Sequence, residues 1–437
     1  MMRTFTRTAV MVGLLAAAGG LGGTGILQAD PRPPQVIQSG FESTDQLLKD
    51  VDRAEEAPLY SAWIVESSRF LNVPHRAFQP DVGEPPFVDL PVNVGIIKAA
   101  NGDLTLYDSG WKQLAYIFNW NTSCCWYGIR QQLQAIGFNP DHVKTIVLGH
   151  GHWDHAGQLS EFPNAVVYIQ KEELTQIDFF LDYPVDFNAG HIRAVNTINP
   201  LTGAQVGPPE QACARTPVCG YPPQTVNEIL GKTLSGKAKI IDGRKEIAPG
   251  LVIHPAFRGH TYGSQLLQVN TPRGQLVFGS DTYSSWTGIR DWLVANIQQT
   301  DTIQQFLAYE KCYVLTSRLN SFNNCVAAHE PTSYTAAYPL TSNWWTIPGG
   351  NCSRAAELIL ANGEKTHVGP DQTPPSQCVS TIPDHPIIPE VGGREIRAWT
   401  RRQGRVPGRV SHLGVDFSRC GSNPGLHSCT QFRIITL

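Results

Sequence analysis

The stretch LGHGHWDHAGQL, residues 148–159, places three of the chain's 13 histidines and one aspartate within six positions. An apolar run precedes it, so His150 and His152 are expected at the end of a buried strand, where residues two apart point the same way. Asp154 and His155 follow at the expected start of a helix and face another side, where they can hold a second ion. Packed or surface histidines do not account for such a cluster. The pattern predicts a metal centre, with zinc as the first candidate and iron, cobalt or manganese as open alternatives.

The rest of the chain predicts a layered α/β protein. Two apolar runs flank an Asn-Gly turn in residues 92–110 and predict a β-hairpin that ends at Asp108. A helix is expected at 44–56, capped by Thr44 or Asp45. Further strands again end at a histidine or an aspartate, and helices follow them. This order places a site at the ends of strands in stacked layers.

The first 29 residues predict an export signal. Arg3 and Arg7 precede an uncharged stretch rich in Leu, Val, Ala and Gly, which ends at the small residue Ala29. The alternative is a retained membrane anchor, because the stretch is about long enough to span. Cleavage would leave 32 basic and 37 acidic side chains, a net charge of −5. We therefore expect a periplasmic or secreted protein with no stable membrane insertion and no nucleic-acid partner.

The ten cysteines fit an exported protein, in which disulfides form readily. Cys213–Cys219 and Cys420–Cys429 are the expected short-loop pairs, although connectivity does not follow from sequence. The alternative is a zinc–thiolate cluster, which the absence of any CxxC pair disfavours.

Four further residues complete a resemblance to a known family. The H-x-H-x-D-H run after an apolar strand resembles the metallo-β-lactamase superfamily, and the match extends over roughly residues 90–335. In that family a third histidine sits in a GHT-x-G turn, where this chain has His260. A metal-bridging aspartate corresponds to Asp281 in LVFGSDTY, and a late histidine corresponds to His329 in CVAAHEP. An acid after an early hairpin corresponds to Asp108.

The resemblance implies an α/β (α+β) fold, namely a four-layer αβ/βα sandwich with two metal ions at the shared edge of two sheets. It implies that Asp108 hydrogen-bonds a ligand or shapes its turn, the alternative being a simple turn or cap residue. The implied ligands are His150, His152 and His260 for one ion, Asp154, His155 and His329 for the other, and Asp281 as the bridge.

The resemblance also implies hydrolysis by a hydroxide that bridges the two metal ions, with Asp154 as a candidate proton acceptor. We expect an exported hydrolase that opens a lactone or cleaves a related small-molecule ester, similar to N-acyl homoserine lactonases. A phosphotriesterase or thioesterase with the same two metals is the alternative. A β-lactamase is less expected, because most true β-lactamases of the superfamily lack the bridging acid. A metal-binding protein without catalysis and a nuclease are the other classes considered.

Aromatic residues are candidates for binding the substrate. Lactonases of the family often carry a tyrosine three residues after the bridging aspartate, whereas here Tyr283 stands two residues after it and Ser284 stands three after. Tyr283 is a candidate catalytic residue, with a structural role as the alternative. The other aromatic candidates for an apolar wall, with core packing as the alternative, are Phe118, Trp120, Trp126, Tyr127, Trp344 and Trp345.

The expected organisation has three parts. A signal peptide at 1–29 precedes a metallo-β-lactamase-fold hydrolase domain at 30–340, which carries an insertion at about 180–247. A Cys-, Pro- and Gly-rich extension at 341–437, tied by disulfides, is expected to pack on that domain.

Overall fold

A computed structural model gives the structure of much of the chain. It describes residues 40–75, 79, 86–112, 126–181, 220, 221, 223–293, 300–316, 322–335, 340, 341, 343–347, 353–365, 414, 415, 434 and 435. The expected signal peptide and both expected short-loop cystines lie outside these residues. Among the described helices, none is both long and apolar enough to cross a membrane.

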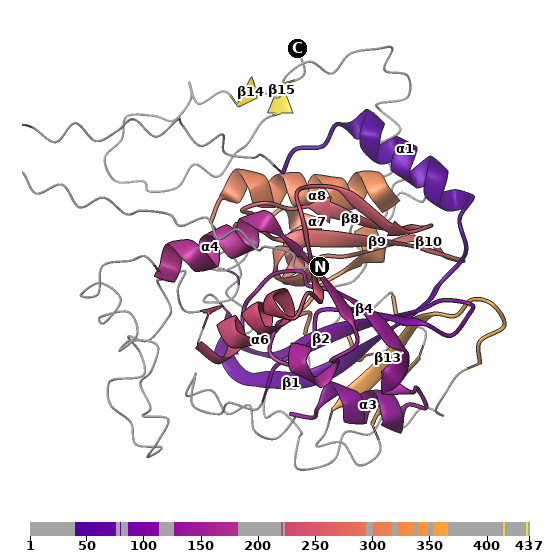
Figure 1. Ribbon diagram of the computed structural model, residues 1–437. Coiled ribbons are helices and arrows are strands. Elements are labelled where there is room, and N and C mark those ends of the chain that lie inside the picture. Colours follow the sequence, from indigo (N-terminus) through magenta and orange to yellow (C-terminus); the bar gives the residue numbers. More distant parts are fainter. Residues whose placement is uncertain are drawn as a thin grey trace, which may run out of the picture. The chain divides into compact units, whose positions relative to one another are not determined.

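One of the two large sheets of the fold has eight strands (Figure 1). Strands β3 to β6 run parallel to one another, and the strands on the other side pair antiparallel. The order across the sheet is β12 (Asn343–Thr346), β13 (Arg354–Ile359), β1 (Ser61–Pro74), β2 (Phe87–Lys98), β3 (Leu104–Tyr107), β4 (Val143–Val147), β5 (Val166–Gln170) and β6 (Ala238–Ile241). The hairpin predicted at 92–110 is confirmed, because β2 and β3 pair antiparallel across the Asn101-Gly102 turn.

The second large sheet has five strands. Its order is β11 (Cys325–Val326), β10 (Gly274–Phe278), β9 (Gln265–Thr271), β8 (Leu251–Pro255) and β7 (Lys245–Ala248). Only the pair β10–β11 is parallel within this described sheet. The two sheets pack face to face, because apolar side chains from both, such as Ile64, Ile97, Leu267 and Phe278, form one buried cluster.

Helices cover the outer faces of both sheets, and the predicted four-layer α/β arrangement is confirmed. Helices α1 (Thr44–Glu55) and α8 (Thr302–Thr316) pack on the five-stranded sheet. Helices α3 (Ile129–Ala135) and α6 (Pro223–Leu234) contribute Ile129, Leu133 and Ile229 to the cluster on the outer face of the eight-stranded sheet. The remaining described α-helices are α4 (Lys171–Leu181) and α7 (Trp286–Asp291).

The cap of the first helix lies one residue before the nearer of the two expected caps. The side chain of Ser43, rather than that of Thr44 or Asp45, accepts a hydrogen bond from the backbone N–H of Gln46. A serine three positions before the bonded N–H satisfies one of the free donors of the first turn, whereas Thr44 stands one residue too late for this bond and Asp45 two.

Two expected boundaries also change. The segment predicted as an insertion at 180–247 contains α6, β6 and β7, and these two strands pair with β5 and β8. Its second part therefore belongs to the core sheets. The predicted extension likewise begins too early, because β12 and β13 pair with each other and β13 pairs with β1. Beyond residue 365, the described residues form only a short pair, β14 (Gly414–Val415) with β15 (Ile434–Ile435).

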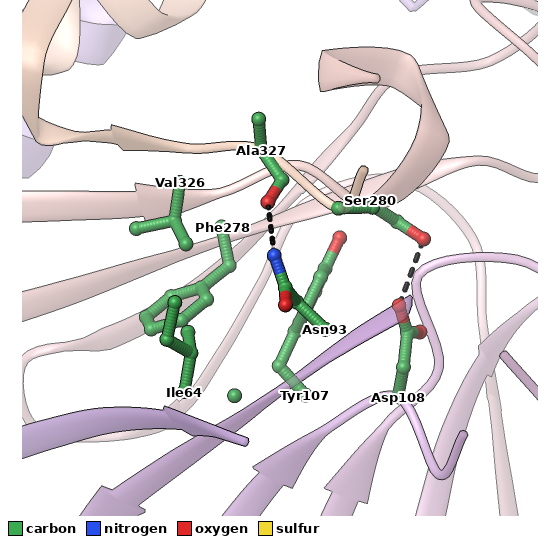
Figure 2. Close-up of a pocket in the computed structure, with 10 residues that line it drawn as sticks. Ile64, Asn93, Tyr107, Asp108, Phe278, Ser280, Val326 and Ala327 are labelled. Carbon is green, nitrogen blue, oxygen red and sulfur yellow. Dashed lines mark hydrogen bonds between the residues drawn. The ribbon is translucent and has the colours of Figure 1, made fainter. Parts of the chain in front are cut away.

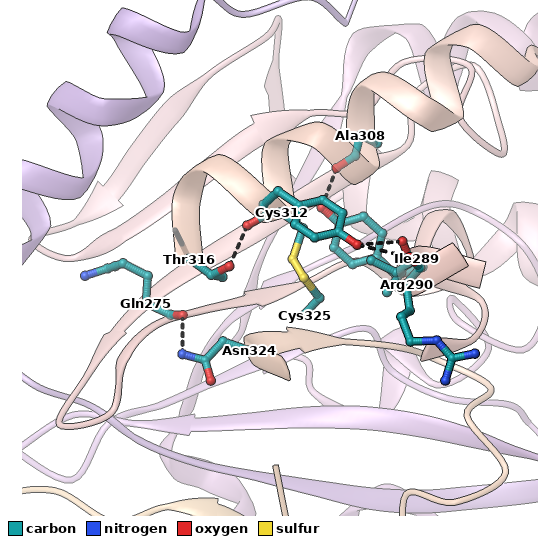
Figure 3. Close-up of a disulfide and its surroundings, with 10 residues drawn as sticks. Gln275, Ile289, Arg290, Ala308, Cys312, Thr316, Asn324 and Cys325 are labelled. Carbon is teal, nitrogen blue, oxygen red and sulfur yellow. Dashed lines mark hydrogen bonds between the residues drawn. A yellow bond between two sulfur atoms is a disulfide. The ribbon is translucent and has the colours of Figure 1, made fainter. Parts of the chain in front are cut away.

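One disulfide lies in the described part of the chain, between Cys312 on α8 and Cys325 at the start of β11 (Figure 3). It joins cysteines 13 residues apart, which the sequence did not single out as partners. The disulfide-rich character expected for the extension is not confirmed by this pair, which lies outside residues 341–437.

Candidate metal centre

The predicted ligands converge at the ends of strands in both sheets. The loop after β4 carries the first four, His260 lies between β8 and β9, Asp281 lies in the 3-10 turn Ser280–Tyr283 after β10, and His329 follows β11. All seven side chains are buried. Potential ligand atoms lie within 4.8 Å of one another in each of two groups that share Asp281. The first group is His150, His152, His260 and Asp281, and the second group is Asp154, His155, His329 and Asp281.

The carboxylate of Asp281 lies between the two groups. Its Oδ1 atom is 2.9 Å from Nε2 of His155 and 2.9 Å from Nε2 of His329, both in the second group. Its Oδ2 atom is 3.2 Å from Nε2 of His260 and 3.9 Å from Nε2 of His150, both in the first group. Each oxygen therefore faces one group, as a bridging ligand requires.

The donor set fits divalent metal ions. In the described residues, Nε2 of His150, Nε2 of His155 and Oδ1 of Asp281 are buried without a hydrogen-bond partner. Buried polar atoms rarely lack partners, and one cation in each ligand group would satisfy all three. Imidazole and carboxylate ligands suit zinc, and also iron, cobalt or manganese.

In three of the ligand histidines, the Nδ1 atom already forms a hydrogen bond within the protein. Each Nδ1 can donate its proton, which leaves Nε2 as a lone pair that faces the centre, the arrangement usual for metal-binding histidines. The partners are Ser280 Oγ for His150 (3.0 Å), Asp108 Oδ2 for His155 (2.9 Å) and the Pro91 carbonyl for His329 (2.7 Å).

Burial and neighbouring charges act differently in the two groups. In the first group, burial and the adjacent His260 lower the pKa of His152 to about 3, so its imidazole stays neutral and able to bind a cation. In the second group burial acts the same way on His329, but Asp281 and Asp154 outweigh it and raise its pKa to about 10. The second group therefore favours a positive charge, which a proton or a metal ion can supply.

Asp108 and Ser280 connect the two groups behind the ligands. Asp108 accepts hydrogen bonds from His155, from the hydroxyl of Ser280 (2.8 Å) and from the backbone N–H of Gly149 (2.6 Å). Figure 2 shows Asp108 and Ser280 side by side at the edge of a small cavity between the sheets. The predicted role of Asp108 in contacting a ligand agrees with this geometry, whereas Ser280 was not foreseen from the sequence.

Tyr283 lies away from the ligand atoms. Its side chain is fully buried against α8, in a cluster with Ala308 and Tyr309, and its hydroxyl donates a hydrogen bond to the Ala308 carbonyl at 2.7 Å. This placement corrects the expectation of a catalytic tyrosine and favours the structural alternative. Tyr283 follows Asp281 by two residues in a 3-10 turn, which directs it into the helix layer.

The described aromatic candidates for an apolar wall likewise pack in or against the apolar clusters. Phe118 and Trp120 lie outside the described residues. Trp126 packs at the margin of an apolar cluster and donates to the Trp111 carbonyl. Trp344 and Trp345 belong to the buried core clusters, and the partly buried Tyr127 packs against one of them.

The cluster that reaches the metal centre contains aromatic residues that the sequence did not single out. The Phe70 ring lies 5.9 Å from the His329 ring and 5.5 Å from the Trp153 ring. Trp153 in turn lies 4.7 Å from Trp111. These three residues form an apolar wall on the side of the second group.

A third cluster of acids and histidine does not resemble a metal site. Glu42 and His254 are bonded to each other, and Lys311 lies 2.7 Å from Glu42. The neighbouring Asp50 pairs with Arg244. The protein's own cations therefore pair with the acids of this cluster.

Comparison with known proteins identifies a family model and several relatives that resemble parts of this chain. The sequence model of the Metallo-beta-lactamase superfamily matches residues 88–309. N-acyl homoserine lactonase AttM of Agrobacterium fabrum (strain C58 / ATCC 33970) is 44% identical over 46 residues, and AttM of Rhizobium johnstonii (strain DSM 114642 / LMG 32736 / 3841) is 41% identical over 46 residues. Each alignment spans 10% of this chain and 18% of the lactonase, so the chain matches less than a fifth of these relatives.

Two solved structures that resemble this chain in backbone are 16% and 19% identical to it in sequence. A mutant of B. thuringiensis AiiA with N-decanoyl-L-homoserine at its active site has a TM-score of 0.42, at 16% identity, covering 63% of this chain and 94% of that one. AidC, a dizinc quorum-quenching lactonase in complex with its product, has a TM-score of 0.41, at 19% identity, covering 63% and 89%.

Proposed function

The chain belongs to the metallo-beta-lactamase superfamily, and from this premise we propose that it is a metal-dependent hydrolase that opens a lactone or cleaves a related carboxylic ester. The observation that carries the proposal is the position of Asp281. Its two oxygens face two separate ligand groups, and this arrangement suits a pair of divalent ions, with zinc as the first candidate.

Two such ions, when bound, supply an activated water and a Lewis acid for the substrate oxygen. The protein's own residues would prepare the site for that chemistry. Asp108 holds the Nδ1 proton of His155 and thereby turns its Nε2 lone pair towards the centre. Asp154 lies at the edge of the second group, with Oδ2 3.4 Å from Nε2 of His329, where it can accept a proton during attack.

Two features support a small uncharged ester as the substrate. The apolar wall of Phe70, Trp111 and Trp153 lies beside His329 and suits an acyl chain or a ring. The net charge of −3 does not favour a nucleic acid as the substrate. The lactonase activity in the names of AttM and AidC belongs to those proteins, and here it guides the choice of the first substrates to assay.

Export is a separate part of the proposal. The uncharged stretch after Arg3 and Arg7 supports a signal peptide that ends near Ala29 and a periplasmic or secreted enzyme. Fractionation of expressing cells, with N-terminal sequencing of the purified protein, would test it. A mature protein that retains Met1 and stays in the cytoplasm would contradict it.

The activity is tested on the purified protein with its metal content measured. Lactones, carboxylic esters, phosphotriesters, thioesters and β-lactams should be assayed side by side, before and after chelation and after zinc is restored. We expect lactone or ester turnover that disappears on chelation and returns with metal. Turnover of phosphotriesters or thioesters alone would reassign the substrate class, and a metal-loaded protein inert towards every substrate would refute the hydrolase proposal.

A further inference from the structure

Glu173 is a buried carboxylate in the first turn of α4 that none of the predicted roles uses. It accepts four hydrogen bonds from three separate segments. Oε1 accepts from the backbone N–H of Gly151 (2.6 Å) and from the hydroxyl of Tyr221 (2.5 Å). Oε2 accepts from the hydroxyl of Thr261 (2.7 Å) and from the backbone N–H of Gly263 (2.9 Å).

These donors are neighbours of the first ligand group. Gly151 lies between His150 and His152, and Thr261 directly follows His260. Tyr221 contacts the group through its ring, which lies 4.9 Å from the ring of His152 at a steep angle. The carboxylate therefore joins both loops that carry the three histidines of this group.

Two glycines bring the backbone close enough for this bonding. A Cβ atom at Gly151 would lie 2.8 Å from Oε1 of Glu173, and one at Gly263 would lie 2.3 Å from its backbone nitrogen. Any other residue at Gly263 would meet backbone atoms of α4, which cannot shift as a side chain can. The contact between the loops and Glu173 is thus built into the backbone of both loops.

We infer that Glu173 is a positioning residue that holds His150, His152 and His260 in place for the first metal ion. The inference rests on the two-metal centre of the proposed function. A carboxylate suits this position because it only accepts hydrogen bonds, and all four partners are donors. An amide would turn an NH2 group towards one pair of donors and leave them unsatisfied in a buried place.

The test is the metal content and metal affinity of Glu173→Gln, with Glu42→Gln as the matched control. Both changes replace a buried, hydrogen-bonded carboxylate by an amide, but Glu42 lies in the separate cluster with His254 and Lys311. We expect Glu173→Gln to bind one of its two ions about 10- to 100-fold more weakly, as is usual when a ligand's outer partner is removed. In the cobalt-substituted protein, the absorption bands of one site should then be lost, and Glu42→Gln should keep both.

The possible results separate the two ideas. Two ions bound by Glu173→Gln with the parent's affinity, or weakening of the same size in Glu42→Gln, would overturn the role of Glu173 and leave the proposed function intact. A parent protein that binds no metal would overturn both. Should Glu173→Gln fail to fold, Thr261→Val removes a single donor, and unchanged metal affinity in that variant would equally contradict the inference.

Discussion

The ion cluster of Glu42, His254 and Lys311 gives a quantitative prediction about stability. Glu42 lies just before α1, and its carboxylate bonds to Nδ1 of His254 at 3.1 Å and pairs with Lys311 of α8 at 2.7 Å. Burial alone would raise its pKa, but His254 and Lys311 outweigh burial and lower the pKa from 4.5 to about 2. The cluster should therefore stabilise the attachment of the first helix in a pH-dependent way.

The magnitude follows from the difference between the folded and unfolded pKa values. A pKa that falls from 4.5 to about 2 corresponds to roughly 3 kcal/mol of unfolding free energy, at about 1.4 kcal/mol for each pH unit. Because the folded pKa is the lower one, this contribution is complete above the unfolded value and is lost as the pH falls towards the folded value. Less than half of it should remain near pH 3, by the same linkage relation.

Urea unfolding of the parent and of Glu42→Gln measures this contribution directly. The difference in unfolding free energy between the two proteins should be about 3 kcal/mol near pH 7 and shrink steadily below about pH 4.5. Other carboxylates titrate in both proteins and cancel in the difference. A difference that stays constant with pH, or that grows in acid, would refute the reasoning.

Four further changes test other parts of the structure. Asp281→Asn should lower kcat/KM by more than about 100-fold and reduce the bound metal, because even outer partners of ligands cost about 10- to 100-fold; unchanged metal content would remove Asp281 as the bridge. Ser280→Ala should weaken metal binding by about 10-fold, since it removes the partner of the His150 imidazole, and isothermal titration would measure the change. Tyr283→Phe should lose about 1 kcal/mol of stability and keep its kcat, whereas a large loss of kcat would restore the catalytic assignment. Replacing Cys312 and Cys325 together by serine should cost about 3 kcal/mol in urea unfolding, and equal stability of the reduced and oxidised parent would contradict this.

The sequence predicted the positions of the ligands better than it predicted their surroundings. His150 and His152 follow a strongly apolar strand, and His260 and Asp281 stand in short patterns that keep their order along the chain. The hydrogen bonds of Ser280 and Glu173 could not be foreseen, because their partners are distant in the sequence. The partners of Ser280 lie 125 to 172 residues away, and those of Glu173 lie 22 to 90 residues away. Single polar residues next to a motif carry no signal of such distant partners.

The predicted boundaries of the insertion and of the C-terminal extension were wrong for a related reason. Strands β6 and β7 have four residues each, and three of the eight positions in AKII and KEIA are charged. Strands β12 and β13 lie among Pro, Gly and Cys residues, which favour loops in a local analysis. Their pairing with β1, β5 and β8 is a long-range effect, and tertiary contacts decide such short strands.

Gly220 has a consequence for protein engineering. A side chain at this position would meet the imidazole of His152, since its Cβ atom would lie 1.7 Å from Cδ2 of that ring, and the Gly220 carbonyl accepts the backbone N–H of Trp153 at 2.9 Å. A designer who alters this part of the chain to change substrate preference must therefore keep glycine at position 220. Any side chain introduced there would displace His152 and disturb the first ligand group.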